Sequence, residues 1–200
     1  MSGHDRTLIL VEGDSDRVAL ETLAGRFGGD LTGLGATIEA IGGAHAIRRV
    51  LEHLIAGDGH AGHINVAGLC DAAQEGYFKR ALEVVGLGRD LDREGMARRG
   101  FFVCVEDLED ELIRALGPAA VEGVIEAQGE IRSFRSFQKQ PAQTGVAVEA
   151  QLRRFMGTHS GRKAQYARAL VEALDLRRVP EPLLRVLGAA GTRLRADPVD

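Results

Sequence analysis

The sequence predicts an α/β fold: a doubly wound, mostly parallel four-stranded sheet followed by a C-terminal helical extension. Segments typical of strands and of helices alternate through the first half of the chain, and the strand signals fade after about residue 118. This alternation is typical of a parallel sheet with helices on both faces. We therefore expect an α/β domain over 1–117 and a helical extension over 118–200.

Apolar runs bounded by turn residues define the expected strands. They lie at 7–11, 36–41, 63–69 and 101–105. Apolar residues at helical spacing predict the helices, at about 16–27, 44–56, 74–85, 119–128, 146–156, 161–174 and 181–187, with a further segment around Phe134 and Phe137.

The first expected strand ends in an acidic turn. Glu12 follows the run Leu8-Ile-Leu-Val11, then comes a glycine, and Asp16 lies four residues after Glu12. Asp14 or Ser15 is expected to cap the helix that follows. The carboxyl ends of parallel strands are where open α/β folds bind ligands. Carboxylate oxygens at that edge suit Mg²⁺ or Mn²⁺.

Acids recur at the ends of later strands. Asp71 follows the third strand, and Asp107 and Glu109 follow the fourth. Because these ends lie side by side in a doubly wound sheet, we expect the three acids to meet Glu12 and Asp16. Each also has a structural interpretation, since Asp71 and Asp107 can cap helices and Glu109 can stabilise a first turn. The recurrence favours a metal site.

Charge is distributed unevenly along a chain of net charge −4. Between 131 and 170 there are eight basic residues and a single acidic one, Glu149. The basic residues are Arg132, Arg135, Lys139, Arg153, Arg154, Arg162, Lys163 and Arg168. An acidic body beside a basic segment is the asymmetry expected when arginines hold a polyanion against a metal site. A solvated helical face explains the same charges equally well.

Several classes of protein are excluded by the sequence. There is no apolar run long enough to span a membrane and no signal peptide, so we expect a cytoplasmic protein. Neither a Walker motif nor GxGxxG is present, which argues against an ATPase or dinucleotide site. Cys70 and Cys104 are expected to be reduced core residues. The histidines lack the spacing of a zinc site.

In order along the chain, these motifs resemble the Toprim domains of OLD-type (overcoming lysogenization defect) endonucleases. The resemblance runs from Glu12-Gly-x-x-Asp16 through Gly68-Leu-Cys-Asp71 and Asp107-Leu-Glu109 to Gly161-Arg-Lys163. It implies a Toprim-like fold with a catalytic domain over 1–117. Toprim domains bind divalent metal and catalyse phosphodiester chemistry, and the OLD type adds a lysine in its helical extension.

The resemblance also implies roles for individual residues. Glu12 and Asp16 would form one metal site, Asp71 a shared or second ligand, and Asp107 with Glu109 the remaining ligands of two ions of Mg²⁺ or Mn²⁺. Glu12 and Lys163 would be the catalytic residues, with Lys163 stabilising the charged transition state. The expected DNA contacts are Arg132, Arg135, Lys139, Arg153, Arg154 and Arg162.

Two departures from the family pattern qualify this assignment. Toprim domains usually have Asp-x-Asp at the third strand, but this chain has Ala73 in place of the second aspartate. Glu75, one helical turn after Asp71, is a candidate replacement. OLD nucleases also carry an ABC-type ATPase ahead of the Toprim domain, so any ATPase would be a separate partner of this chain.

Three functions therefore compete at this point. The leading hypothesis is a metal-dependent nuclease that nicks or cleaves DNA. A small-nucleotide hydrolase or nucleotidyl transferase would make little use of the basic segment, and a degenerate module, suggested by Ala73, would bind nucleic acid or a partner without cleaving it. Phe134 and Phe137, interleaved with basic residues, either stack on a single strand or anchor helices in the core. His159, beside Lys163, is either a phosphate contact or a plain loop residue.

Overall fold

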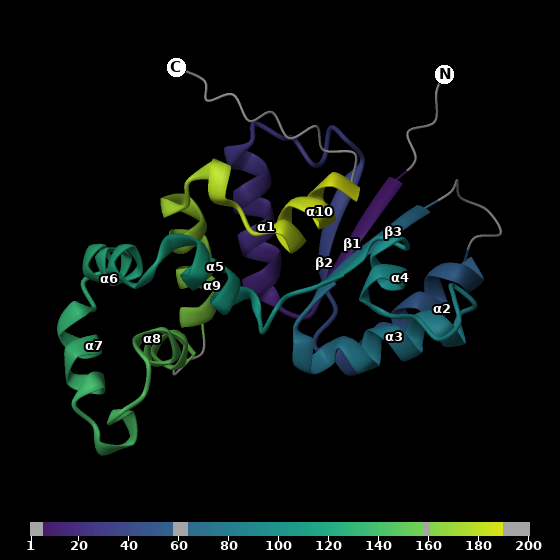
Figure 1. Ribbon diagram of the computed structural model, residues 1–200. Coiled ribbons are helices and arrows are strands. Elements are labelled where there is room, and N and C mark those ends of the chain that lie inside the picture. Colours follow the sequence, from purple (N-terminus) through teal and green to yellow (C-terminus); the bar gives the residue numbers. More distant parts are fainter. Residues whose placement is uncertain (1–5, 58–63, 158–160, 190–200) are drawn as a thin grey trace.

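In the computed structural model, which describes residues 6–57, 64–157 and 161–189, four parallel strands form one sheet in the order β2-β1-β3-β4 (Figure 1). The strands are β1 (Arg6–Val11), β2 (Ala36–Ala40), β3 (Ile64–Cys70) and β4 (Phe101–Val103). β1 pairs with β2 and β3, and β3 pairs with β4, always in parallel. The predicted α/β fold is confirmed.

Helices connect the strands and make up the chain after β4. They are α1 (Asp14–Arg26), α2 (Ile47–Gly57), α3 (Glu75–Val84), α4 (Arg93–Ala97), α5 (Leu108–Leu116), α6 (Pro118–Ala127), α7 (Ile131–Gln138), α8 (Val148–Met156), α9 (Arg162–Ala173) and α10 (Glu181–Ala189). Among the described helices, none is long and apolar enough to cross a membrane. The short α4 has no counterpart among the expected segments, because five residues are too few to show a helical period.

The two faces of the sheet bury different sets of side chains, as the alternation of strand residues requires. Ile9 and Val11 belong to the core on the α1 side, whereas Leu10 between them belongs to the core that α2 and α3 cover. On β4, Phe102 belongs to the core on the α1 side and Phe101 to the core that α2 and α3 cover. Since the second half of β1 is buried on both faces, it is a continuous apolar run, and the carboxyl end of the strand is held in place by this packing.

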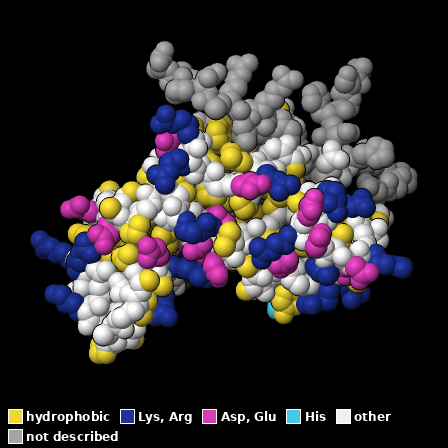
Figure 2. Space-filling view, in the orientation of Figure 1, with side chains coloured by type: hydrophobic (Ala, Val, Ile, Leu, Met, Phe, Trp, Pro, Cys, Tyr) yellow, Lys and Arg dark blue, Asp and Glu magenta, His cyan; other side chains and the backbone are white. Residues whose placement is uncertain are grey.

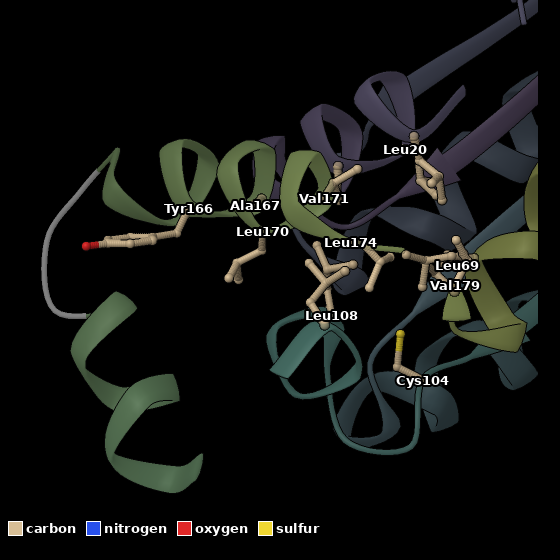
Figure 3. Close-up of a cluster of buried hydrophobic side chains, with 14 of the residues drawn as sticks. Leu20, Leu69, Cys104, Leu108, Tyr166, Ala167, Leu170, Val171, Leu174 and Val179 are labelled. Carbon is tan, nitrogen blue, oxygen red and sulfur yellow. The ribbon is translucent and has the colours of Figure 1, made fainter. Parts of the chain in front are cut away.

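The helical extension packs onto the same core rather than standing apart from it. In Figure 3, Ala167, Leu170 and Val171 of α9 point toward the cluster that also holds Leu20 of α1 and Leu69 of β3. α9 lies along α1, and the Arg26 guanidinium donates a hydrogen bond of 2.6 Å to the Val171 carbonyl. This packing places the beginning of α9 near the carboxyl edge of the sheet.

Gly68, in the middle of β3, is required by close packing. A Cβ at this position would lie 2.6 Å from the ring of Phe101 and 3.2 Å from the carbonyl oxygen of Leu10. We expect Gly68→Ala to lower the free energy of unfolding by about 1–3 kcal/mol, the usual cost of overpacking a core. Urea denaturation measures this change.

The matched control is Gly123→Ala, in the exposed middle of α6, where a Cβ meets nothing within 4 Å. Alanine there should raise the free energy of unfolding by up to about 1 kcal/mol, because it is the better helix former. Equal effects of the two substitutions would contradict the packing argument.

Candidate metal centre and nucleic-acid surface

Glu12 and Asp71 meet at the carboxyl edge of the sheet. Both follow neighbouring parallel strands, β1 and β3, and Glu12 Oε1 accepts a hydrogen bond of 3.1 Å from the Asp71 amide. The Asp71 side chain makes no capping bond to the turn after it, so its carboxylate is available for another role. The expectation that Asp71 caps a helix is therefore wrong.

Asp16 lies in the first turn of α1, beside Glu12. Its Oδ2 accepts a hydrogen bond of 3.0 Å from the Gly13 amide, and Gly13 itself occupies the N-cap position. The predicted cap at Asp14 or Ser15 is wrong, because the helix begins at Asp14, directly after that glycine. Asp16 thus both fixes the turn after β1 and brings a second carboxylate to the edge of the sheet.

Asp107 and Glu109 come from the beginning of α5. Asp107 caps the helix, since its Oδ1 accepts a bond of 2.9 Å from the Asp110 amide, while its Oδ2 lies 2.6 Å from Arg153 Nε. The predicted capping role of Asp107 is confirmed. Glu109 has a side chain only 6% exposed, and its Oε1 lies 3.4 Å from Lys163 Nζ.

Burial and the charges of neighbouring acids raise the pKa values of Asp16 and Asp71. Burial raises the pKa of Asp16 to about 7, against the Gly13 amide that lowers it, and the charges of Glu109 and Glu12 raise it further. Burial, followed by the charges of Asp16 and Glu12, raises the pKa of Asp71 to about 8. The pKa of Glu12 is also raised by burial. Perturbed carboxylates of this kind cluster at functional sites.

Lys163 supplies the opposing charge. Burial lowers its pKa, but the carboxylates of Glu109, Asp107 and Asp71 outweigh that effect and leave the pKa above its usual value. The side chain is 52% exposed, so the ammonium faces both the acids and the solvent.

The donor set fits a divalent cation in its chemistry. Five carboxylates supply hard oxygen ligands, which Mg²⁺ and Mn²⁺ prefer. Among the described residues, Glu109 Oε1 is a buried oxygen without a hydrogen-bond partner. As the side chains stand, no three His, Cys, Asp or Glu residues in the described part of the chain form a group that could hold a metal ion. Binding therefore requires the carboxylates to rotate from their present contacts.

Glu75 is engaged elsewhere. Its Oε2 lies 2.9 Å from Arg93 Nη2, an ion pair between the beginnings of α3 and α4. To act as a metal ligand in place of the aspartate that Ala73 replaces, Glu75 would have to leave Arg93. Its assignment as a ligand stays a prediction.

The predicted DNA contacts divide into two groups. Arg135 pairs with Glu122, Arg153 pairs with Asp107, and Arg162 pairs with Glu130. The second group is exposed and forms no ion pair with any described residue. It consists of Arg132, Lys139 and Arg154. Their assignment to DNA binding stays a prediction, as does that of the paired arginines.

Glu130 is a positioning residue that the sequence analysis does not identify. It accepts hydrogen bonds from Arg162, at 3.0 Å, and from the Tyr166 hydroxyl, at 2.7 Å. These contacts hold the beginning of α9, on which Lys163 lies. Because Glu130 and Arg162 are 32 residues apart, no local spacing could have revealed the pair. His159 lies outside the described residues.

The family model described as "Overcoming lysogenization defect protein-like, TOPRIM domain" matches residues 5–72. No curated protein matches the chain.

Two similar solved structures cover nearly the whole chain. The C-terminal region of the Burkholderia pseudomallei OLD protein is 20% identical, with 96% of this chain and 99% of that one covered and a TM-score of 0.67. The C-terminal region of the Xanthomonas campestris pv. campestris OLD protein is 22% identical, with 93% and 94% covered and a TM-score of 0.64. Residues 5–72 therefore match an OLD-like Toprim domain, and the described part of the chain has the fold of an OLD C-terminal region.

Proposed function

We propose that this protein is a divalent-metal-dependent nuclease that nicks or cleaves DNA. The observation that carries the proposal is the meeting of Glu12, Asp16, Asp71 and Glu109 at one edge of the sheet, with Lys163 against them. Carboxylates gathered in this way repel one another unless cations or protons are present. Phosphodiester hydrolysis with Mg²⁺ or Mn²⁺ uses such a group of acids beside a cationic side chain.

Each acid has a proposed place in that reaction. Glu12 and Asp16 would hold one ion, Asp71 would be a shared or second ligand, and Asp107 and Glu109 would complete the set. Divalent ions bound there would supply an activated water and would neutralise charge on the leaving oxygen.

The remaining groups bind and orient the substrate. Lys163 compensates charge on the phosphoryl oxygens. The exposed Arg132, Lys139 and Arg154 contact the DNA backbone without reading its sequence.

A second candidate function is a binding module without catalytic activity. Ala73 removes one acid, and the Arg93 ion pair occupies Glu75, the residue that would replace it. A protein of this kind would bind nucleic acid through its basic segment, and the binding would survive the loss of Glu12.

Nicking of supercoiled plasmid, with Mg²⁺ or Mn²⁺ titrated from zero, tests the proposal. We expect the wild-type protein to nick the plasmid only with metal present, and Glu12→Gln to be slower by about 10²-fold or more, because it removes a charged ligand at the centre. Glu52→Gln is the matched control, since this glutamate lies on α2 and pairs with Arg48; it should cleave like the wild type.

The opposite results have distinct meanings. Cleavage that Glu12→Gln leaves unchanged would contradict the assigned centre. A wild-type protein that binds the plasmid but never nicks it, at any metal concentration, would favour the binding module.

A further inference from the structure

A groove lies on the helical extension, away from the carboxylates. It has a volume of about 670 Å³. Its lining comes from α7 and the turn after it, with Arg132, Ser133, Ser136, Phe137 and Gln140, and from Phe155 of α8 and Arg162 of α9. Figure 2 shows Lys and Arg side chains around this arm of the molecule, which contains α6, α7 and α8 in Figure 1.

The floor of the groove consists of flat groups, which are two phenylalanine rings tilted against each other and a guanidinium. The ring centroids of Phe137 and Phe155 are 5.7 Å apart, and the Arg162 guanidinium lies over the Phe155 ring, 4.8 Å from its centroid. Glu130 holds Arg162 in that position at 3.0 Å. Phe134 is fully buried beneath Phe137 and Phe155, so the floor rests on the core. A nucleobase stacks well on aromatic and guanidinium surfaces of this kind.

The walls of the groove carry hydrogen-bonding groups and one cation. Ser133, Ser136 and Gln140 are exposed, and the Ser136 hydroxyl donates to the Arg132 carbonyl at 3.0 Å, which leaves its oxygen free to accept. The exposed guanidinium of Arg132 forms no ion pair with a described residue. Hydrogen-bonding side chains suit the edges of a base, and the guanidinium suits a phosphate.

The groove and the candidate metal centre both include a residue from the beginning of α9. Arg162 contacts the floor of the groove, and its neighbour Lys163 contacts Glu109 at 3.4 Å. A strand that passes Lys163 therefore has the groove beside it.

We propose that this groove binds an unpaired stretch of nucleic acid, with a base stacked on Phe137 and a phosphate at Arg132. The inference deepens the proposed function and rests on it for the identity of the substrate. Bases inside a duplex are stacked on one another and do not present a free face, so a groove of this kind discriminates between single and double strands. The protein should bind single-stranded segments more tightly than a duplex of the same length.

Fluorescence anisotropy with a labelled oligothymidine and a matched duplex, in EDTA so that no cleavage occurs, tests the inference. We expect Phe137→Leu to weaken oligothymidine binding about 5- to 150-fold, the loss of one base–aromatic stack, and to leave duplex binding unchanged. Arg132→Gln should weaken oligothymidine binding and reduce the slope of log Kd against log salt by about 0.7. Phe27→Leu, on a partly buried phenylalanine after α1, and Arg49→Gln, on α2, are the controls.

Two results would overturn the inference. One is a Phe137→Leu variant with unchanged oligothymidine affinity, and the other is an equal loss of affinity for the duplex. If Phe137→Leu melts much earlier than the wild type, the exposed Gln140→Ala decides: unchanged oligothymidine binding by that variant also overturns the inference. Failure of the proposed nuclease activity appears separately, as absence of plasmid nicking, because the binding readout needs no cleavage.

Discussion

Lys163→Ala is expected to slow metal-dependent DNA cleavage by about 10²- to 10³-fold, the usual cost of removing one group that stabilises transition-state charge. The ammonium lies 3.4 Å from Glu109, and neighbouring carboxylates raise its pKa, so it stays charged throughout the neutral range. Single-turnover cleavage of a labelled duplex at saturating metal measures the effect. Lys79→Ala is the matched control, since that lysine lies on α3 and contacts Glu83.

The same variant separates a catalytic role from simple balancing of charge. Without Lys163, the buried Glu109 loses its cationic neighbour, and the metal-free protein should become less stable. Saturating Mg²⁺ or Mn²⁺ supplies another counterion, so the stability difference should shrink while the cleavage defect persists. Recovery of full cleavage at high metal would show that Lys163 only balances charge, and would contradict its assignment as a catalytic residue.

Strand ends are the part of the candidate site that the sequence reveals. The buried end of β1, Ile9 to Val11, is apolar, so the first acid after it marks where the strand stops. Glu12 and Asp71 follow this rule on paired strands, and their contact at 3.1 Å is a consequence of parallel pairing. The acids of the turn after β4 are found in the same way, although β4 ends at Val103, two residues before its predicted end.

Contacts between distant helices are the part that the sequence does not reveal. Arg153 lies among the predicted DNA contacts, but it pairs with Asp107, 46 residues away. Arg93 forms an ion pair with Glu75, and it lies on α4, a helix too short to be recognised in the sequence. Such pairs depend on how helices pack, and packing leaves no period in the sequence. The two phenylalanines of α7 differ in the same respect. The predicted core packing is confirmed for Phe134, whereas Phe137 is only partly buried.

Acidity is expected to stabilise the metal-free protein. The pKa values of Asp16 and Asp71, about 7 and about 8, lie above the values near 4 of an unfolded chain. The folded state therefore binds more protons across this interval, and its stability is greatest below pH 4 for these two groups and falls as pH rises to about 8. Thermal melting in EDTA should show a midpoint that decreases over that range, once the changes due to other groups are subtracted with Asp71→Asn.

Asp71→Asn removes a charge without removing a capping bond, because the Asp71 side chain makes none. At pH 8.5 in EDTA it should raise the free energy of unfolding by about 1 kcal/mol, a midpoint shift of roughly 2–4 °C for a chain of this size. The pH dependence of its midpoint should also be shallower than that of the wild type. Asp90→Asn, at an exposed loop position, should melt like the wild type.

With metal present, a rise in pH is expected to favour activity, although it weakens the metal-free fold. An ion must displace the protons of Asp16 and Asp71, so wild-type cleavage at limiting metal should rise with pH up to about 8, and this rise should be smaller at saturating metal. Asp71→Asn, more stable without metal, should gain less stability from Mg²⁺ and cleave about 10²-fold more slowly. A variant that melts and cleaves like the wild type at every pH would show that Asp71 belongs neither to the coupled acids nor to the metal centre. Stability without metal and activity with it are thus opposed at one side chain, because the repulsion that weakens the fold is the charge that would hold the ion.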